Sequence, residues 1–441
     1  MTQIVAFVSL FLGLVVGDQP VEVMVADVVV AVEFYLDGEL VGKRTNAPWL
    51  HRCSFGDDLR PHNLEAVAYD EGGKELGRAT QWLNLPRQPA EAGIIVTEGE
   101  DGRDANASLT WKSLVGAKPK TIKVSFDGLP LEFDDPYNIP LPPFDPAQLH
   151  YLRAELQFAE NVSSVSEVTF GGAYGQTVDR QLTAVPVAVG ERESPGLEAL
   201  AGRFRTDSHP LHVVAVDEGP AEVVIVRDLK AQRALDSLGR GWRKQVGTLR
   251  YNRTGSQALK SVTRLKENQT LRFLTPVPTH NRKEGYTLFP RSPEFTRDEG
   301  GVYWLMTGWR PHSTAHKEQQ LADAVAVAGM SAAARNRRRA VVLVLSGDHS
   351  DISQLSAQHV RQYLRDLHVP LHVWLPERHA PAERMTAWGQ AIDISTLGKL
   401  ERAVTRLSQD LDHQRIVWID GFHLPQEIAL VPGSDEVQLV N

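Results

Sequence analysis

Three aspartates stand directly behind apolar runs that have the composition of buried β-strands. Asp228 ends the string AEVVIVRD, Asp348 ends VVLVLSGD and Asp420 ends IVWID. In an open α/β sheet, ligands bind outside the carboxyl ends of the strands, and carboxylate oxygens are the ligands that Mg²⁺ and Ca²⁺ prefer. Aspartates at strand ends also cap free backbone N–H groups. The sequence therefore predicts an acidic surface at the strand ends, either as a ligand site or as a set of structural caps.

Ser346, Asp348 and His349 are the residue types of a hydrolytic triad, but they are close neighbours in the sequence. A triad needs a nucleophile on a sharp turn, with its base and its orienting carboxylate brought in from other strands. The chain contains no G-x-S-x-G or H-E-x-x-H motif, and no P-loop or G-x-G-x-x-G motif follows a strand. These absences favour a non-enzymatic protein. Hydrolysis or phosphoryl transfer at Asp228 and Asp348 is the least favoured alternative.

The elements that position these residues begin after about residue 191, where apolar runs alternate with helical patterns. Several runs are apolar at nearly every position, which is typical of strands buried on both faces. Alternating strands and helices predict a parallel sheet with helices on both sides, so residues 191–441 are expected to form a doubly wound, Rossmann-like α/β domain. The strands are predicted at 222–226, 271–274, 340–345, 371–375 and 416–419, and the helices at 231–238, 319–334, 357–367 and 397–411.

The order of these elements resembles the von Willebrand factor A (VWFA) family. The strings AEVVIVRD, QQLADAVAVAG and RRRAVVLVLSGDHSDIS carry this resemblance, which covers about residues 200 to 425. The sequence is most similar to the A-type domains of exported acidobacterial proteins, in which immunoglobulin-like modules precede the A domain. The resemblance implies a head that binds a protein partner.

The resemblance also implies the position of a metal-ion-dependent adhesion site (MIDAS). In the family, this site uses Asp-x-Ser-x-Ser after the first strand, a threonine from a later loop and an aspartate after the fourth strand. The matching positions are Asp228, then Thr314 or Ser313, and finally Asp348. The cofactor of such a site would be Mg²⁺ or Ca²⁺.

The two serine positions of that motif hold Lys230 and Gln232. A charged lysine has no lone pair to offer a metal, and its ammonium would occupy the place of the metal by pairing with the carboxylate of Asp228. We therefore expect a degenerate MIDAS in this chain.

Residues 275–311 make a segment that is longer than an ordinary connection. Exposed aromatic side chains beside arginines are favoured at interface centres, so this segment, with Ser313 and Lys230, is the predicted partner-binding site. The alternative is that the segment packs on its own domain, with Val302 to Met306 as an added edge strand. The predicted partner-binding aromatic residues are Tyr286, Phe295, Trp304 and Trp309.

The N-terminal half is predicted to consist of two β-sandwich modules, at residues 18–87 and 88–190. In the first module, VEFYL leads into Asp37-Gly38, which is the signal of a tight hairpin turn. The strings VEFYLDGELVGKRTNAPW and HNLEAVAYDEGGKELG resemble bacterial immunoglobulin-like modules of exported surface proteins. Such modules imply adhesion or spacing.

Residues 1–17 are either a signal peptide or a first β-strand. The apolar run from Ile4 to Val16 has the length of a signal peptide, but no Lys or Arg precedes it. No other segment approaches the length of a membrane span, so none is expected in the mature chain. The formal net charge of -8 argues against a nucleic-acid partner. We predict an exported (periplasmic, cell-surface or extracellular) modular protein that binds a protein partner, or alternatively a structural scaffold or assembly subunit without metal.

Overall fold

The chain forms two compact units, one made of residues 1–85 with 181–441 and one made of residues 86–180. The module boundary predicted at residue 190 is wrong, because β15 (Leu182–Val189) pairs with strands of the first unit. The computed structural model describes residues 5–9, 11, 13–25, 28–86, 90–97, 105–113, 118–145, 150–159, 162–170, 182–190, 197–207, 209–245, 263–281, 286–309, 318–378, 384–432 and 437–440.

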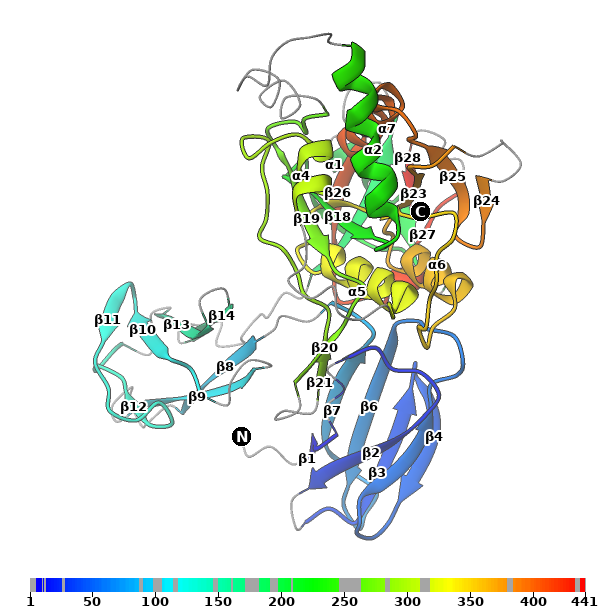
Figure 1. The fold of residues 1–441 in the computed structure, drawn as a ribbon. Coiled ribbons are helices and arrows are strands. Elements are labelled where there is room, and N and C mark those ends of the chain that lie inside the picture. The colour runs from blue at the N-terminus through cyan, green and yellow to red at the C-terminus, as the bar shows by residue number, and fades with distance from the viewer. Residues whose placement is uncertain are drawn as a thin grey trace. The chain divides into compact units, whose positions relative to one another are not determined.

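The N-terminal segment of the first unit is a sandwich of antiparallel strands (Figure 1). Its predicted hairpin turn is confirmed, since Asp37 and Gly38 have φ angles of 52° and 84°. Near the N-terminus, β1 contributes Val5 to the sandwich core. One sheet contains β1 (Val5–Phe7), β2 (Asp18–Val25) and β5 (Leu50–Ser54), and the other has the order β4 (Glu39–Arg44), β3 (Ala31–Leu36), β6 (His62–Tyr69), β7 (Glu75–Leu83).

The second unit is also built from two antiparallel sheets around one apolar core. Its Pro-rich stretch contains the two-residue strand β12 (Ile139–Pro140). Pro140 is tolerated there because β12 is an edge strand. The sheets are β11 (Leu129–Leu131), β10 (Thr121–Phe126), β13 (His150–Ala159), β14 (Val162–Phe170), and β12 (Ile139–Pro140), β9 (Asn106–Ser113), β8 (Ala90–Thr97).

The C-terminal part of the first unit contains the predicted doubly wound α/β domain. Five strands of its sheet are parallel, and every residue of β18 and β22 is buried. In chain order the first three strands of this sheet are β18, β19 and β22, and β19 and β22 lie on opposite sides of β18. The topological switch point therefore lies between β18 and β22. The spatial order is β19 (Gln269–Leu274), β18 (Ala221–Arg227), β22 (Arg338–Val344), β23 (Leu371–Leu375), β25 (Gly389–Asp393), then the antiparallel β24 (Met385–Thr386).

Helices cover both faces of this sheet, because alternate residues of each central strand point to opposite sides. Val224 and Val341 pack in one core with α5 and α6, whereas Val223 and Val342 pack in another with α2, α4 and α7. The helices are α2 (Ala231–Gln245), α4 (Val302–Gly308), α5 (Leu321–Ala333), α6 (Ala357–Asp366) and α7 (Leu397–Asp412).

The run 416–419 forms a strand as predicted, but its assignment to the parallel sheet is wrong. It lies in β26 (Gln414–Asp420), which pairs antiparallel with β15 and β17 (Val213–Asp217) in a separate four-stranded sheet with β28 (Val437–Leu439). An apolar run specifies burial, and it does not specify the neighbouring strand. Asp420 therefore does not stand at the strand ends that carry Asp228 and Asp348.

The edge strand predicted at Val302 to Met306 is also wrong, because these residues form α4. Val302, Tyr303, Leu305 and Met306 are all buried. Their spacing places them on one face of a short helix, and that face packs against the α2 and α7 side of the sheet.

The N-terminal sandwich packs directly on the α/β domain within the first unit. The buried Tyr363 of α6 donates its hydroxyl to the Asn84 carbonyl at 2.7 Å, and the Trp82 and Phe422 ring centroids lie 4.1 Å apart. Leu59 and Leu85 belong to the same apolar core as α5 and α6. The first module is thus a supporting part of the α/β domain.

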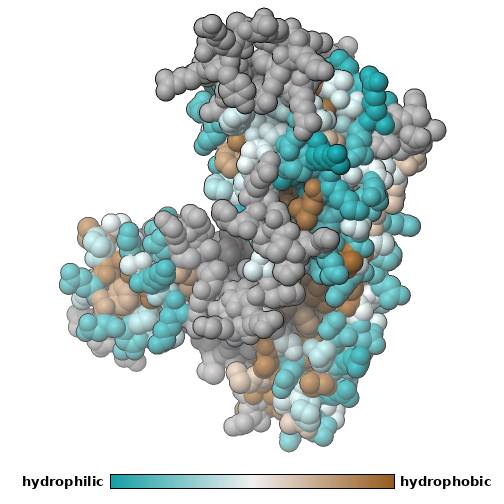
Figure 2. All heavy atoms as spheres, viewed as in Figure 1, coloured by the Kyte–Doolittle hydropathy of each residue, from teal (hydrophilic) through white to brown (hydrophobic). Residues whose placement is uncertain are grey.

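The surface seen in Figure 2 is largely hydrophilic, with small hydrophobic patches between the polar side chains. Within the described ranges, no helix has both the length and the apolar character needed to cross a membrane.

Candidate functional site

Asp228 stands at the centre of the switch point, directly behind β18. Its side chain is fully buried, and its backbone N–H donates to the Val344 carbonyl of β22 at 2.9 Å. The Oδ1 atom accepts hydrogen bonds from the Lys230 N–H at 2.9 Å and from Gln319 Nε2 at 2.8 Å, while Oδ2 accepts one from the Ser346 N–H at 3.0 Å. Asp228 therefore ties together the ends of β18 and β22 and the residues before α5.

Gln319 is the neighbour of Asp228 that the sequence analysis missed. It is 2% exposed, and its Nε2 also donates to the Ser350 carbonyl at 2.8 Å. Its Oε1 accepts from the Leu229 N–H at 3.1 Å, and its own carbonyl accepts from the Ile352 N–H at 3.0 Å. A neutral amide thus lies against the carboxylate of Asp228.

Lys230 and Asp348 form the exposed part of the switch point. The Lys230 Nζ lies 3.4 Å from Asp348 Oδ2, and their side chains are 44% and 97% exposed. The prediction that the Lys230 ammonium pairs with Asp228 is wrong, because only the backbone N–H of Lys230 contacts Asp228. Gln232 donates to Asp236 of α2 at 2.8 Å.

The residues of the hydrolytic pattern do not form a triad. Ser346 donates its hydroxyl to Glu377 Oε1 at 3.1 Å, and the Gly347 N–H donates to Glu377 Oε2 at 2.9 Å. The His349 ring contacts the Ser346 carbonyl at 3.3 Å. Glu377, which follows β23, was not identified from the sequence, and it fixes the turn after β22.

The remaining acidic residue after β22 caps a helix. Asp351 accepts hydrogen bonds from the N–H groups of Leu321 and Ala322 at 2.8 and 3.0 Å, at the beginning of α5. In return, Asp323 of α5 accepts from the Leu355 N–H at 3.1 Å. Asp351 therefore caps the free backbone N–H groups at the N-terminus of α5.

The aromatic residues predicted to bind a partner are partly buried on the domain itself. Trp309 stacks on Phe273 with ring centroids 5.1 Å apart and an interplanar angle of 10°, and Phe295 meets Phe273 edge-on at 6.1 Å. Trp304 packs on the same core. These contacts agree with the self-packed alternative.

Three predicted residues have no described side chain. The backbone of Tyr286 pairs in β21 (Tyr286–Leu288) with β20 (Thr279–Asn281), and Ser313 and Thr314 lie outside the described residues.

The described residues of the switch point do not fit a divalent metal. The Asp228 oxygens already accept three N–H hydrogen bonds, and the nearby Lys230 ammonium would repel a cation. In the described part of the chain, no group of three His, Cys, Asp or Glu side chains is arranged to hold a metal ion. What the geometry provides is an exposed ion pair, Lys230 with Asp348, beside a buried carboxylate that is hydrogen-bonded by the chain itself.

Comparison with known proteins identifies no family. No family model and no curated protein matches the chain. Among solved structures, the chain is similar to the fibronectin(III)-like modules of Clostridium thermocellum CbhA, with 17% identity over 18% of this chain and 93% of that chain and a TM-score of 0.17.

Two further structures are similar to a larger part of the chain. One is proximal thread matrix protein 1 from the mussel byssus with a zinc-occupied MIDAS motif, with 13% identity over 45% of this chain and 48% of that chain and a TM-score of 0.27. The other is the human COPII-coat protein Sec24c, with 12% identity, 44% and 33% coverage and a TM-score of 0.26. With identities and TM-scores this low, the similarities carry no argument about function.

Proposed function

We propose that the chain is a non-enzymatic, exported modular protein whose VWFA-like α/β domain binds a protein partner without a divalent metal. The observation that carries this proposal is the closure of Asp228 by Gln319. A buried carboxylate with three hydrogen-bond donors is already stabilised, so a metal would have to displace the amide and overcome the charge of Lys230. The site is therefore a degenerate MIDAS that works through its surface.

The binding surface in this proposal is the loop 347–352 together with Lys230. Residues 347–351 of this loop are exposed, and Ile352 is 52% exposed. Gln319 holds the loop from beneath through Ser350 and Ile352. A loop fixed on a rigid sheet and carrying an exposed ion pair and an exposed apolar side chain suits recognition of a protein surface.

A metal titration tests the metal-independent part of the proposal. Calorimetry with Mg²⁺, Ca²⁺ and Mn²⁺ should show no binding to the wild type. The Lys230→Ser/Gln232→Ser variant supplies two hydroxyl groups but keeps Gln319 against Asp228, so it should show no binding either. Stoichiometric binding to the wild type that is lost in Asp348→Asn would contradict the proposal.

An affinity capture tests the partner-binding part. The immobilised full chain should retain a stoichiometric protein from the cell envelope fraction of the producing organism, and EDTA should not release it. Lys230→Glu should abolish the capture. The matched control is Lys43→Glu, which reverses another exposed, ion-paired lysine and should leave the capture intact. Equal loss in both variants would remove the switch point from the proposal.

A structural scaffold remains the second candidate, because the first module and the α/β domain share one apolar core and form a single body. A scaffold should show concentration-dependent light scattering of the purified chain in EDTA. Scattering that stays at the monomer value across the concentration range would eliminate this candidate.

A further inference from the structure

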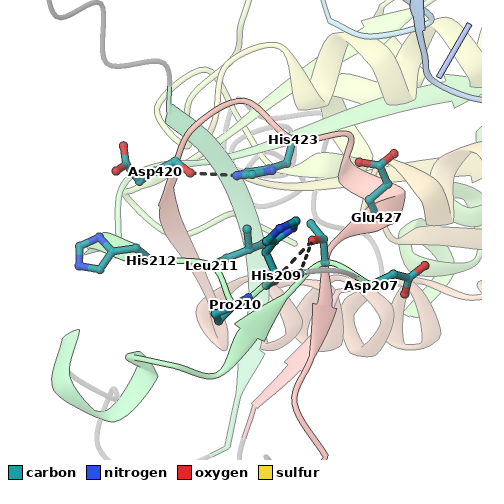
Figure 3. A pocket seen from close by; sticks show the side chains of 9 residues that line it. Asp207, His209, Pro210, Leu211, His212, Asp420, His423 and Glu427 are labelled. Carbon is teal, nitrogen blue, oxygen red and sulfur yellow. Dashed lines mark hydrogen bonds between the residues drawn. The ribbon is translucent and has the colours of Figure 1, made fainter. Parts of the chain in front are cut away.

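A pocket of about 610 Å³ opens beside the antiparallel sheet and is separate in its residues from the switch point. Its lining comes from the segment before β17, from the end of β26 and from η3 (Pro425–Glu427) (Figure 3). We name it the histidine pocket. Its ionisable lining residues are the carboxylates Asp207, Asp420 and Glu427 and the imidazoles His209, His212 and His423.

The pocket is held by hydrogen bonds to elements from distant parts of the chain. The backbone N–H of His423 donates to Thr183 Oγ1 of β15 at 2.9 Å, and its ring contacts the Asp420 carbonyl at 2.9 Å. Gln426 of η3 donates to the Pro61 carbonyl of the N-terminal sandwich at 3.0 Å. A lining fixed in this way requires little ordering when a ligand binds.

The electrostatic character of the pocket is negative. Among the described residues that line it, there are three carboxylates and no lysine or arginine. Burial raises the pKa of Glu427, and the nearby carboxylates of Asp37 and Asp207 raise it further, while His423 opposes them without cancelling the effect. A group with excess positive charge would relieve this repulsion.

The chemistry of the lining favours an organic cation over a metal ion. The described residues contain no group of three ligand side chains converging on one point, and in Figure 3 Asp207 and Glu427 lie on one side of His423 and Asp420 on the other. Carboxylates that lie apart suit several cationic groups on one ligand, each paired with its own carboxylate. Guanidinium is suited to this role because its planar fork pairs with a carboxylate through two parallel N–H donors.

We propose that the histidine pocket binds the guanidinium groups of an arginine-rich peptide segment. This site is independent of the partner surface proposed at the switch point, because the two share no residue. The cavity volume is in the range of ligand pockets, and Leu211 and Pro210 supply an apolar wall for the methylene stem of the side chain.

The experiment is a calorimetric titration of the full chain with an acetylated, amidated tri-arginine peptide. A tri-citrulline peptide, which keeps the shape and removes the charge, is the ligand control. Agmatine is a second arm that presents guanidinium as a free small molecule. Glu427→Gln should weaken tri-arginine binding about fivefold, as expected for the loss of one exposed ion pair. Glu401→Gln, which removes an exposed carboxylate from α7, gives the same change in net charge.

Binding of tri-arginine that is weakened by Glu427→Gln, unaffected by Glu401→Gln and absent for tri-citrulline supports the site. Agmatine binding with the same dependence on Glu427 supports it too and identifies a small guanidinium compound as the source of the cation. The proposal is overturned if neither tri-arginine nor agmatine binds. It is also overturned if Glu427→Gln and Glu401→Gln weaken binding equally. Lys230→Glu should not weaken binding, so the outcome is distinguishable from failure of the switch-point proposal.

Discussion

The switch point and the histidine pocket both contain carboxylates, but the burial and the hydrogen bonding of these carboxylates differ. At the switch point, Asp228 is fully buried and its oxygens accept three N–H hydrogen bonds from the chain itself. In the pocket, Asp207, Asp420 and Glu427 are exposed around a cavity. A carboxylate whose partners come from the fold contributes to stability, whereas carboxylates left facing a cavity are available to a ligand.

The difference lies in what each neighbouring segment supplies. The segment before α5 inserts Gln319 against Asp228, and this neutral amide closes the space at the strand ends. The segment before β17 contributes histidines and Asp207 to the pocket, and no cationic side chain of the described residues enters its lining. The strand ends, where an α/β sheet usually binds ligands, are therefore filled by a side chain of the protein itself. The histidine pocket beside the antiparallel sheet remains open.

Substitution of Asp228 should have the largest effect. In Asp228→Ala, three N–H donors lose this acceptor, and two of these hydrogen bonds are buried. We therefore expect a loss of about 3 kcal/mol in the free energy of unfolding. For a domain of this size, that corresponds to a transition temperature lowered by roughly 6 to 12 °C. Differential scanning calorimetry measures this shift.

The matched control is Asp420→Ala in the pocket, which should change the stability by less than about 0.5 kcal/mol because the side chain is exposed. Equal destabilisation by the two alanine variants would remove the distinction between a structural and an available carboxylate.

Substitution of Gln319 should have an intermediate and local effect. Gln319→Leu removes the side-chain bonds to Asp228, Leu229 and Ser350, at a cost of about 2 kcal/mol. Amide hydrogen exchange of residues 346–355 should become faster, as mass spectrometry of peptides would show.

The control for this variant is a buried glutamine elsewhere. Gln414 is 2% exposed, and its side chain bridges the backbone N–H and carbonyl of Arg339 at 2.8 and 3.1 Å. Gln414→Leu should reduce stability by a similar amount and leave exchange in residues 346–355 unchanged. Faster exchange there in both variants would mean that Gln319 has no specific role in holding the loop.

Much of the α/β domain could be predicted because its central strands are buried on both faces. The apolar runs of β18 and β22 and the patterns of α5, α6 and α7 have ranges close to those predicted. The strand β25 (GQAID) was missed because it has few apolar residues. Conversely, β26 was identified as a strand, but its apolar run contains no information about which sheet it joins.

The two sites show the limit of prediction more clearly. Asp228 and Asp348 could be placed from their position after apolar runs, and both do stand at the switch point. Gln319 precedes an apolar helix and has no sequence feature that separates it from an exposed glutamine, because its burial depends on the loop that follows β22. The histidine pocket joins the segment before β17 with the segment after β26. This pairing arises from the antiparallel contact of β17 with β26 and from that of Phe204–Arg205 with Ala429–Leu430.

The smallest expected effect concerns Glu427 and its pH dependence. Its pKa is raised by burial and by neighbouring carboxylates, so on raising the pH the unfolded chain loses this proton before the folded chain does. The folded state is therefore disfavoured by this group once the pH exceeds the ordinary glutamate range, and unaffected at lower pH, where both states are protonated. Glu427→Gln should raise the free energy of unfolding slightly at pH 7, by less than about 0.5 kcal/mol because the side chain is only partly buried, and should not change it near pH 3. Calorimetry across this range, with Glu401→Gln for comparison, measures the difference.

A Glu427→Gln variant that is less stable than the wild type at pH 7 would show that the carboxylate is engaged by the fold, as Asp228 is, and the contrast between the two regions would then fail.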